Sequence, residues 1–142
     1  MPVVSVTRLR VRSWRFLPAY FLLAMRCALQ AQRSSGNLSV RVLRDRERTF
    51  WTSTSWESEA AMKAFMLAEP HRTAMRKLLE WCDEAALVHW TQTDSELPVW
   101  TEAHRRLVQD GRPSKVNQPS QAHRSYSIPL PADAAKRELR LK

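Results

Sequence analysis

Two hydrophobic periods alternate along the first 111 residues of this chain, and the changes between them divide it into strands and helices. Apolar residues at every second position are typical of a half-buried strand, whereas a spacing of three and four indicates an amphipathic helix. We therefore expect strands over 3–12, 37–44, 49–56 and 84–91, and helices over 13–34, 58–68, 70–82 and 99–109. This order predicts an α+β, ferredoxin-like βαββαβ fold with a four-stranded antiparallel sheet.

Within the first helix, apolar residues recur at one face and predict the side that packs on the sheet. Leu17, Phe21, Ala24, Met25 and Ala28 form that face. The second helical region is interrupted by Pro70, because proline lacks the N–H that an interior helical position donates. The fold therefore has a broken second helix and an extra helix near the C-terminus.

The third strand carries tryptophan on both of its faces. Trp56 points to one side and Trp51 to the other, since successive side chains of a strand alternate. A sheet with one solvated face does not usually carry large aromatic residues on both faces. We predict that helices cover one face and that a second copy of the chain covers the other, which makes a homodimer.

Composition excludes several classes of protein. The length fits one domain, and only two glycines, 75 positions apart, rule out glycine-rich phosphate loops. Cys27 and Cys82 form no motif and suggest reduced thiols in a cytoplasmic protein. The four histidines lack metal-ligand spacing, and the apolar run 16–25 is too short to span a membrane.

The net charge of +9 is unevenly distributed. Residues 112–142 hold seven Lys or Arg against two Asp or Glu, together with several prolines and serines. We therefore divide the chain into a folded domain over 1–111 and a basic, partly extended tail over 112–142, with room for a short helix over 132–141. Nucleic-acid binding is not expected, because no aromatic residues alternate with the arginines of the first strand.

Two stretches resemble a known superfamily. WTSTSWESEAAMKAFMLAEPHRTAMRKL resembles the segment from the third strand onward in the dimeric α/β-barrel proteins, which include antibiotic-biosynthesis monooxygenases. PVWTEAHRRLVQDGRPSKV is similar to the closing segment of an uncharacterised domain family in that superfamily. Together these resemblances cover roughly residues 3–116.

The resemblance implies a small-molecule-binding protein, with cofactor-independent oxidation of an aromatic or polyketide-like substrate as the first hypothesis. An enzyme of this kind is an oxidoreductase without a cofactor. A non-catalytic ligand-binding or interaction domain is the alternative, and haem binding is a third. Haem-degrading members carry Asn, Trp and His where this chain has Thr7, Phe65 and Met75, which argues against haem degradation.

The candidate site residues follow from this comparison and from the aromatic pattern. His71, at the start of a helix beside an apolar face, is the candidate catalytic base, because a neutral imidazole can accept a proton near neutral pH. A flat apolar or aromatic ligand would be enclosed by large rings and oriented by hydroxyl groups. The candidate substrate-binding residues are Thr7, Trp51, Thr54, Trp56, Phe65, Met75, Trp81 and Trp90.

Overall fold

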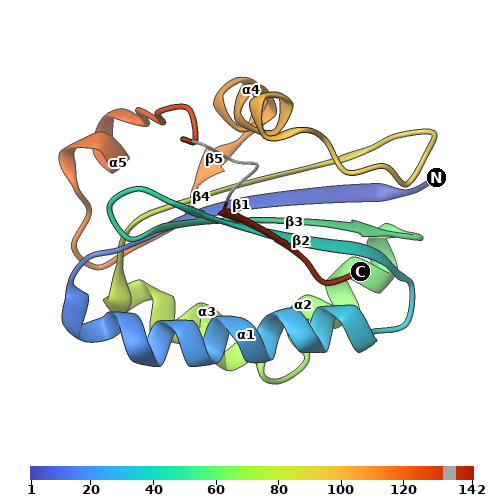
Figure 1. Ribbon diagram of the computed structural model, residues 1–142, viewed down its shortest axis with the longest axis horizontal. Helices are drawn as coiled ribbons and strands as arrows, with labels where there is room; N and C mark the ends of the chain where they lie inside the picture. Colours follow the sequence, from blue (N-terminus) through green and yellow to red (C-terminus); the bar gives the residue numbers. More distant parts are fainter. Residues whose placement is uncertain (133–136) are drawn as a thin grey trace.

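The computed structural model describes residues 1–132 and 137–142 and shows a sheet between two layers of helices (Figure 1). The helices within residues 17–81 lie on one face of the sheet, and those within residues 100–125 lie on the other. The strands are β1 (Val3–Val11), β2 (Asn37–Asp45), β3 (Thr49–Trp56), β4 (Cys82–Thr91), β5 (Arg112–Pro113) and β6 (Glu138–Arg140). The helices are α1 (Leu17–Arg33), α2 (Glu59–Leu67), α3 (His71–Trp81), α4 (Trp100–Asp110) and α5 (Gln121–Ser125), with a 3₁₀ turn at Trp14–Phe16.

The βαββαβ core matches the predicted ferredoxin-like order, but the sheet has six strands rather than four. Its order is β5-β4-β1-β3-β2-β6, and every neighbouring pair is antiparallel. The two extra strands add to the free edges of β4 and β2. They contain only two and three residues, so they are too short to show an alternating pattern in the sequence.

The break in the second helical region occurs where Pro70 predicts it. The Ser58 hydroxyl accepts a hydrogen bond from the backbone N–H of Ala61, which caps α2 at its N-terminus. That helix ends at Leu67, the Glu69–Pro70 peptide bond is cis, and α3 starts at His71. The break therefore places His71 in the first turn of a new helix.

The predicted inward face of α1 is correct at Ala28 and wrong at Phe21. The buried residues of this helix are Tyr20, Ala28 and Ala31, whereas Phe21 is 55% exposed. Tyr20 packs on Phe50 of β3, with their ring centroids 4.9 Å apart, and the alanines allow close approach to the sheet. Because α1 is apolar on almost every side, its periodicity does not decide which side turns inward.

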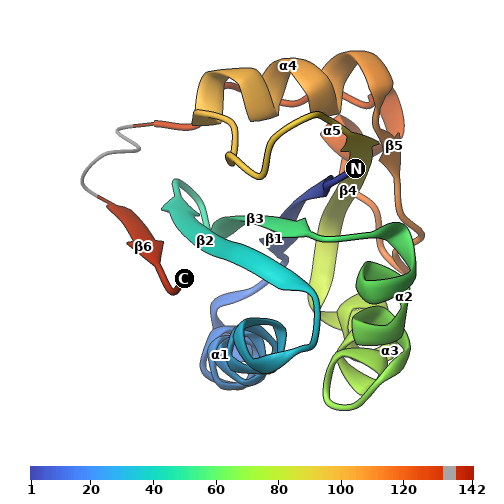
Figure 2. The ribbon, with the colours of Figure 1, turned by 90° about the vertical axis from the view of Figure 1, so that its right-hand side faces the viewer.

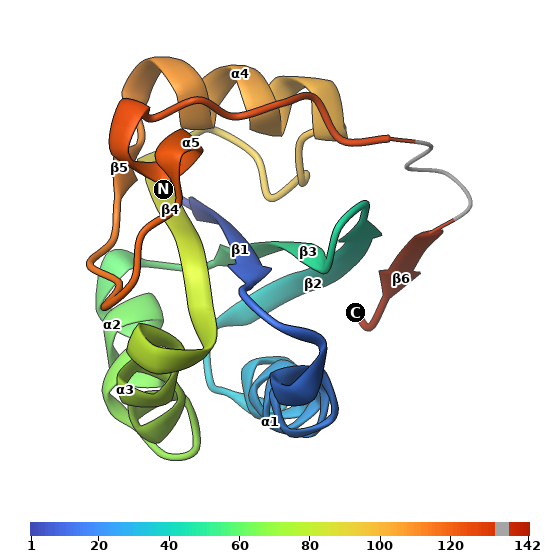
Figure 3. The same cartoon turned by 90° about the vertical axis from the view of Figure 1, so that its left-hand side faces the viewer.

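The second face of the sheet is covered by α4 of the same chain. Leu107 and Ala103 are fully buried there against Trp51, Val4 and Val6. Figures 2 and 3 show α4 lying across the side of the sheet opposite α1. The apolar face on which the homodimer was predicted is therefore already buried, so that argument for a dimer fails, and the homodimer itself stays a prediction.

The segment after Arg112 runs back along the sheet. The backbone N–H of Ser114 donates to the carbonyl of Ala85 at 2.8 Å, and the Tyr126 hydroxyl donates to the carbonyl of Leu107 at 2.6 Å. At the other edge, β6 pairs with β2. Within the helix suggested over 132–141, Glu138–Arg140 form a strand instead, and residues 133–136 lie outside the described residues. Whether 1–111 forms a separate domain remains a prediction.

Candidate functional site

The structure divides the predicted site residues between the two faces of the sheet. Thr7, Thr54 and Trp56 face α1–α3, because the Trp56 cluster includes Ala31 of α1 and Met62 of α2. Trp51 and Trp90 lie on the opposite face. Trp51 donates from Nε1 to Asp45 and packs on Trp100, and Trp90 is covered by the Arg106 guanidinium at 4.5 Å.

The two remaining helical candidates differ in their distance from His71. Met75 lies one turn further along α3 and is 45% exposed. Trp81 ends that helix ten residues later, roughly 15 Å away at 1.5 Å per residue. Trp81 therefore does not share a site with His71, and neither do Trp51 and Trp90.

Trp56, Phe65 and His71 form a continuous row of rings between the sheet and the helices. The rings of Trp56 and Phe65 are stacked with centroids 5.1 Å apart, and Phe65 lies 4.6 Å from the imidazole of His71. Trp56 is fully buried, and its Nε1 donates to the Thr54 hydroxyl at 2.9 Å. The row thus runs from the buried sheet to the half-buried His71.

The hydrogen bonding of His71 determines which ring nitrogen can react. Nδ1 lies 3.2 Å from the carbonyl oxygen of Met66, which can only accept, so Nδ1 carries the proton. Nε2 therefore keeps a lone pair, and none of the hydrogen bonds among the described residues engages it. Burial lowers the pKa of His71 more than the Met66 hydrogen bond raises it. The ring is neutral at pH 7 and can accept a proton at Nε2.

Gln30 of α1 holds the backbone around His71 in place. Its Oε1 accepts from the N–H of His71 at 2.9 Å, and its Nε2 donates to the carbonyls of Phe65 at 3.1 Å and Ala68 at 3.4 Å. One amide thus connects the end of α2 to the start of α3. Gln30 is not among the residues predicted from the sequence, because it is one of several polar residues on α1 and no motif distinguishes it.

Four hydroxyl groups line the helix-facing side of the sheet beside this row. Thr7 pairs with Thr52, and Ser5 pairs with Thr54, so all four share one face of β1 and β3. Ser5, Thr7 and Thr52 are only half-buried, although β1 and β3 are inner strands. No hydrogen bond among the described residues uses these three hydroxyls. Solvent therefore reaches the layer between sheet and helices, and its floor offers free donors and acceptors.

Two thiols and one phenol near this layer stay protonated at neutral pH. Burial raises the pKa of Cys27 to about 11 and that of Cys82 to about 12, with smaller contributions from Glu69 and Asp83 respectively. Burial also raises the pKa of Tyr20, assisted by the two thiols. Since a thiol reacts as the thiolate, these groups do not supply a nucleophile.

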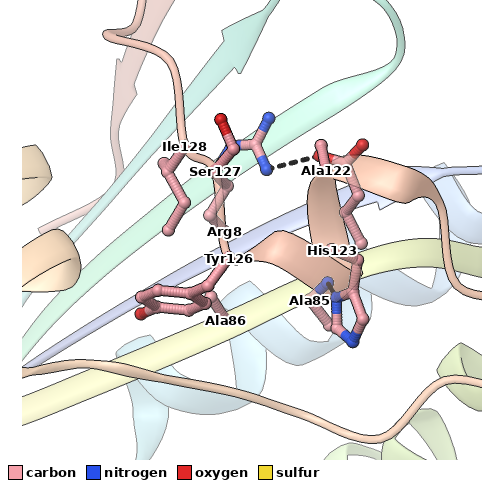
Figure 4. A pocket seen from close by; sticks show the side chains of 9 residues that line it. Arg8, Ala85, Ala86, Ala122, His123, Tyr126, Ser127 and Ile128 are labelled. Carbon is pink, nitrogen blue, oxygen red and sulfur yellow. Dashed lines mark hydrogen bonds and ion pairs between the residues drawn. The ribbon is translucent and has the colours of Figure 1, made fainter.

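The opposite face of the sheet holds a buried ion pair. Arg8 Nη1 donates to Glu84 Oε1 at 2.8 Å, and neither side chain is more than 6% exposed. Arg10 and the Ser120 hydroxyl hold the other carboxylate oxygen at 3.0 and 2.8 Å. Figure 4 shows Arg8 beside a hollow of about 10 Å³ under α5, lined also by His123 and Tyr126.

A larger hollow of about 220 Å³ lies between the β2–β3 turn and the C-terminal segment. It is lined by Arg8, Asp45, Arg46, Glu47, Thr49, Pro129 and Leu130. Charges of both signs line it, so it does not suit a flat apolar molecule.

Within the described residues, no group of three or more His, Cys, Asp or Glu side chains could hold a metal ion, and no helix could cross a membrane.

Solved structures share this fold at low sequence identity. A putative antibiotic biosynthesis monooxygenase from Nitrosomonas europaea superposes with a TM-score of 0.58 and 15% identity, over 64% of this chain and 89% of that one. SnoaB, a cofactor-independent oxygenase from Streptomyces nogalater, gives 0.53 and 19%, over 66% and 94%. A conserved protein from Methanosarcina mazei gives 0.58 and 11%, over 66% and 94%. Identity this low establishes the fold alone.

No curated protein matches the sequence. One family model does, over residues 26–117, which is well over half of the chain and contains the whole Trp56–Phe65–His71 row. The fold is that of the antibiotic-biosynthesis-monooxygenase-like proteins, as the resemblance of the two sequence stretches predicted. The chain belongs to the family described as Domain of unknown function (DUF3291).

Proposed function

We propose that this chain binds a flat aromatic or polyketide-like molecule between its sheet and helices α1–α3 and oxidises it without a cofactor. One observation carries the proposal. His71, neutral and with Nε2 free, ends a row of aromatic rings beside a floor of unpaired hydroxyls. The fold shared with a cofactor-independent oxygenase supports the same class of reaction.

Binding would use the two kinds of surface in this layer. Phe65 offers a half-buried aromatic wall, stacked on Trp56, against which another flat ring can pack. The hydroxyls of Thr7 and Thr52 can donate to carbonyls or accept from phenols of the ligand. An aromatic molecule that carries oxygen at its edge would satisfy both surfaces.

The chemical step would begin at Nε2 of His71, which removes a proton from an acidic CH₂ group of the substrate. The carbanion delocalises into the aromatic system and transfers an electron to O₂, and recombination of the two radicals forms a peroxide. The imidazolium returns its proton to the peroxide, and loss of water with the second C–H proton leaves a carbonyl. The balance is R₂CH₂ + O₂ → R₂C=O + H₂O, and the base is regenerated.

A non-catalytic binding function is the second candidate. Its support is that no hydrogen bond among the described residues joins the His71 ring to another acid or base, because Nδ1 contacts only a backbone carbonyl. A free Nε2 can equally accept a hydrogen bond from a phenol and hold it without reaction. This candidate predicts ligand binding with no turnover.

The experiment combines a binding screen with oxygen uptake. Hydroxylated polycyclic aromatics with an activated CH₂ group are titrated while tryptophan fluorescence is followed, and each binder is then tested with an oxygen electrode. We expect His71→Ala to lower kcat by about 10²-fold or more, as loss of a general base does. Phe65→Leu should weaken binding, because Phe65 supplies the half-buried wall, while Trp90→Phe, an aromatic substitution on the other face of the sheet, serves as the control.

The outcomes separate the hypotheses. Turnover that His71→Ala leaves unchanged would refute the proposed base. Binding without oxygen uptake would favour the non-catalytic function. Haemin is titrated in parallel. A Soret shift that disappears in His71→Ala would favour haem binding over both candidate functions.

A further inference from the structure

The outer side of α1 exposes large apolar side chains to solvent. Phe21 is 55% exposed, Leu22 59% and Leu29 38%, and Trp14, in the turn that leads into the helix, is 69% exposed. Leu22 and Leu29 are seven residues apart, two helical turns, so they lie on the same side of α1. Four large apolar side chains are therefore exposed within sixteen residues of α1 and the turn before it.

The composition of α1 also indicates that its outer side is normally covered. Only two of its seventeen residues, Arg26 and Arg33, carry a charge. A helix that is apolar on all sides is usually buried on all sides. Here the sheet covers the inner side and α3 lies alongside, while none of the described residues covers the outer side (Figures 2 and 3).

The charged residues of α1 and of the segments directly before and after it have a single sign. Residues 1–44 contain eight arginines and no Asp or Glu, and Arg15, Arg26 and Arg33 are exposed. On the neighbouring α3, the exposed basic residues are Arg72, Arg76 and Lys77.

Two acidic groups of α3 and the turn before it, Glu80 and Glu69, are already engaged. Glu80 pairs with Arg12 at 2.6 Å. Glu69 hydrogen-bonds to Thr73, and its pKa is lowered first by that bond and then by Arg76 and Arg72. The outer side of the helical layer is therefore apolar and basic together.

We propose that this surface, defined by Trp14, Phe21, Leu22 and Leu29 with Arg15, Arg26 and Arg33, lies on an anionic lipid bilayer. Exposed Trp, Phe and Leu insert at the boundary between headgroups and acyl chains, and arginines attract the anionic headgroups. In this orientation α1 lies parallel to the membrane plane. The proposal is independent of the proposed function.

Two other occupants fit this surface less well. A second copy of the chain, related by a twofold axis, would bring the exposed arginines of one α1 toward those of the other, with like charges opposed. A nucleic acid would pair with the arginines but would gain little from contact with Leu22 and Leu29, whose side chains neither stack on bases nor form hydrogen bonds. A lipid surface uses both the charges and the aliphatic groups.

The test is flotation with vesicles of phosphatidylcholine alone or mixed with phosphatidylglycerol, at low and high salt. We expect binding to the mixed vesicles that weakens as salt screens the charges. Arg26→Gln should reduce the partition coefficient about fivefold, because one basic residue near an anionic surface contributes on the order of 1 kcal/mol. Phe21→Ser with Leu22→Ser should reduce it by about tenfold or more.

Val108→Ser is the matched control, since Val108 is 43% exposed on α4, on the other side of the molecule. Brominated lipid should also quench Trp14 fluorescence, and this quenching should be lost in Trp14→Phe. Binding to mixed vesicles no stronger than to phosphatidylcholine, or an equal loss in Val108→Ser, would overturn the proposal. So would a dimer in analytical ultracentrifugation that Phe21→Ser with Leu22→Ser dissociates, because a second copy would then be the occupant.

Discussion

Replacing Leu107 by alanine tests whether α4 is seated on the sheet as the structure shows. The Leu107 side chain is fully buried in the cluster with Trp51 and Trp100. Truncation removes three carbons from a packed site and leaves a cavity. The free energy of unfolding should therefore fall by about 3 kcal/mol, within the range of about 2–5 kcal/mol that is typical of Leu→Ala substitutions in protein cores. For a chain of this size that corresponds to a fall in Tm of roughly 10 °C.

The assay is urea unfolding followed by tryptophan fluorescence, with a thermal melt in parallel. The neighbouring residue supplies the control: Val108 is 43% exposed, so Val108→Ala should change the free energy of unfolding by less than about 0.5 kcal/mol. Equal effects of the two substitutions would show that α4 does not pack on this face. This face of the sheet would then be free to bind a second copy of the chain, and a dimer would be detected when the oligomeric state of Leu107→Ala is measured.

Four further predictions concern buried or half-buried polar groups. Arg8→Met should destabilise the fold by about 3 kcal/mol in urea unfolding, because it leaves Glu84 buried with fewer partners; an unchanged midpoint would refute the ion pair. Burial opposes ionisation of Glu84, but the hydrogen bonds from Arg8 and Ser120 outweigh this effect and lower the pKa of Glu84. The stability that ionised Glu84 contributes is therefore present above its pKa in the unfolded chain, and it is lost as pH falls through its pKa in the folded protein. Glu84→Gln should flatten that acid dependence. The pKa of His71 is lowered chiefly by burial. The free energy of unfolding is therefore unaffected by this ring above pH ~6.5, the pKa of histidine in the unfolded chain, and it declines as pH falls toward the pKa in the folded protein. NMR titration of the His71 ring should give a pKa below that of an exposed histidine. Gln30→Ala should cost about 2 kcal/mol and shift this titration, since three backbone groups around His71 lose their partner; a titration identical to that of the parent would contradict the positioning role.

The ferredoxin-like order could be predicted because each element carries its own local signal. The alternation in β3, the Ser58 cap and the break at Pro70 all depend on neighbours in the sequence. The same local patterns identified His71 and its place at a helix start. The placement of Trp51 and Trp56 on opposite faces also follows from alternation alone.

The composition of the site could not be predicted in the same way. Gln30 is separated from His71 by 41 residues, and no period links an amide on α1 to the backbone between α2 and α3. Trp81 and Trp90 resemble site residues in sequence, yet the length of α3 and the pleat of β4 remove them from the His71 row. Side-chain chemistry indicates candidates, but only distance decides which of them meet.

The sequence by itself determined which segments are strands and helices, because hydrophobic period, caps and breakers act over a few residues. Only the tertiary structure decided what covers each surface. It placed α4 rather than a second copy over Trp51, turned Tyr20 inward and Phe21 outward, and buried Arg8 against Glu84. These outcomes depend on contacts between residues far apart in the chain, where burial and pairing in the whole fold outweigh local pattern.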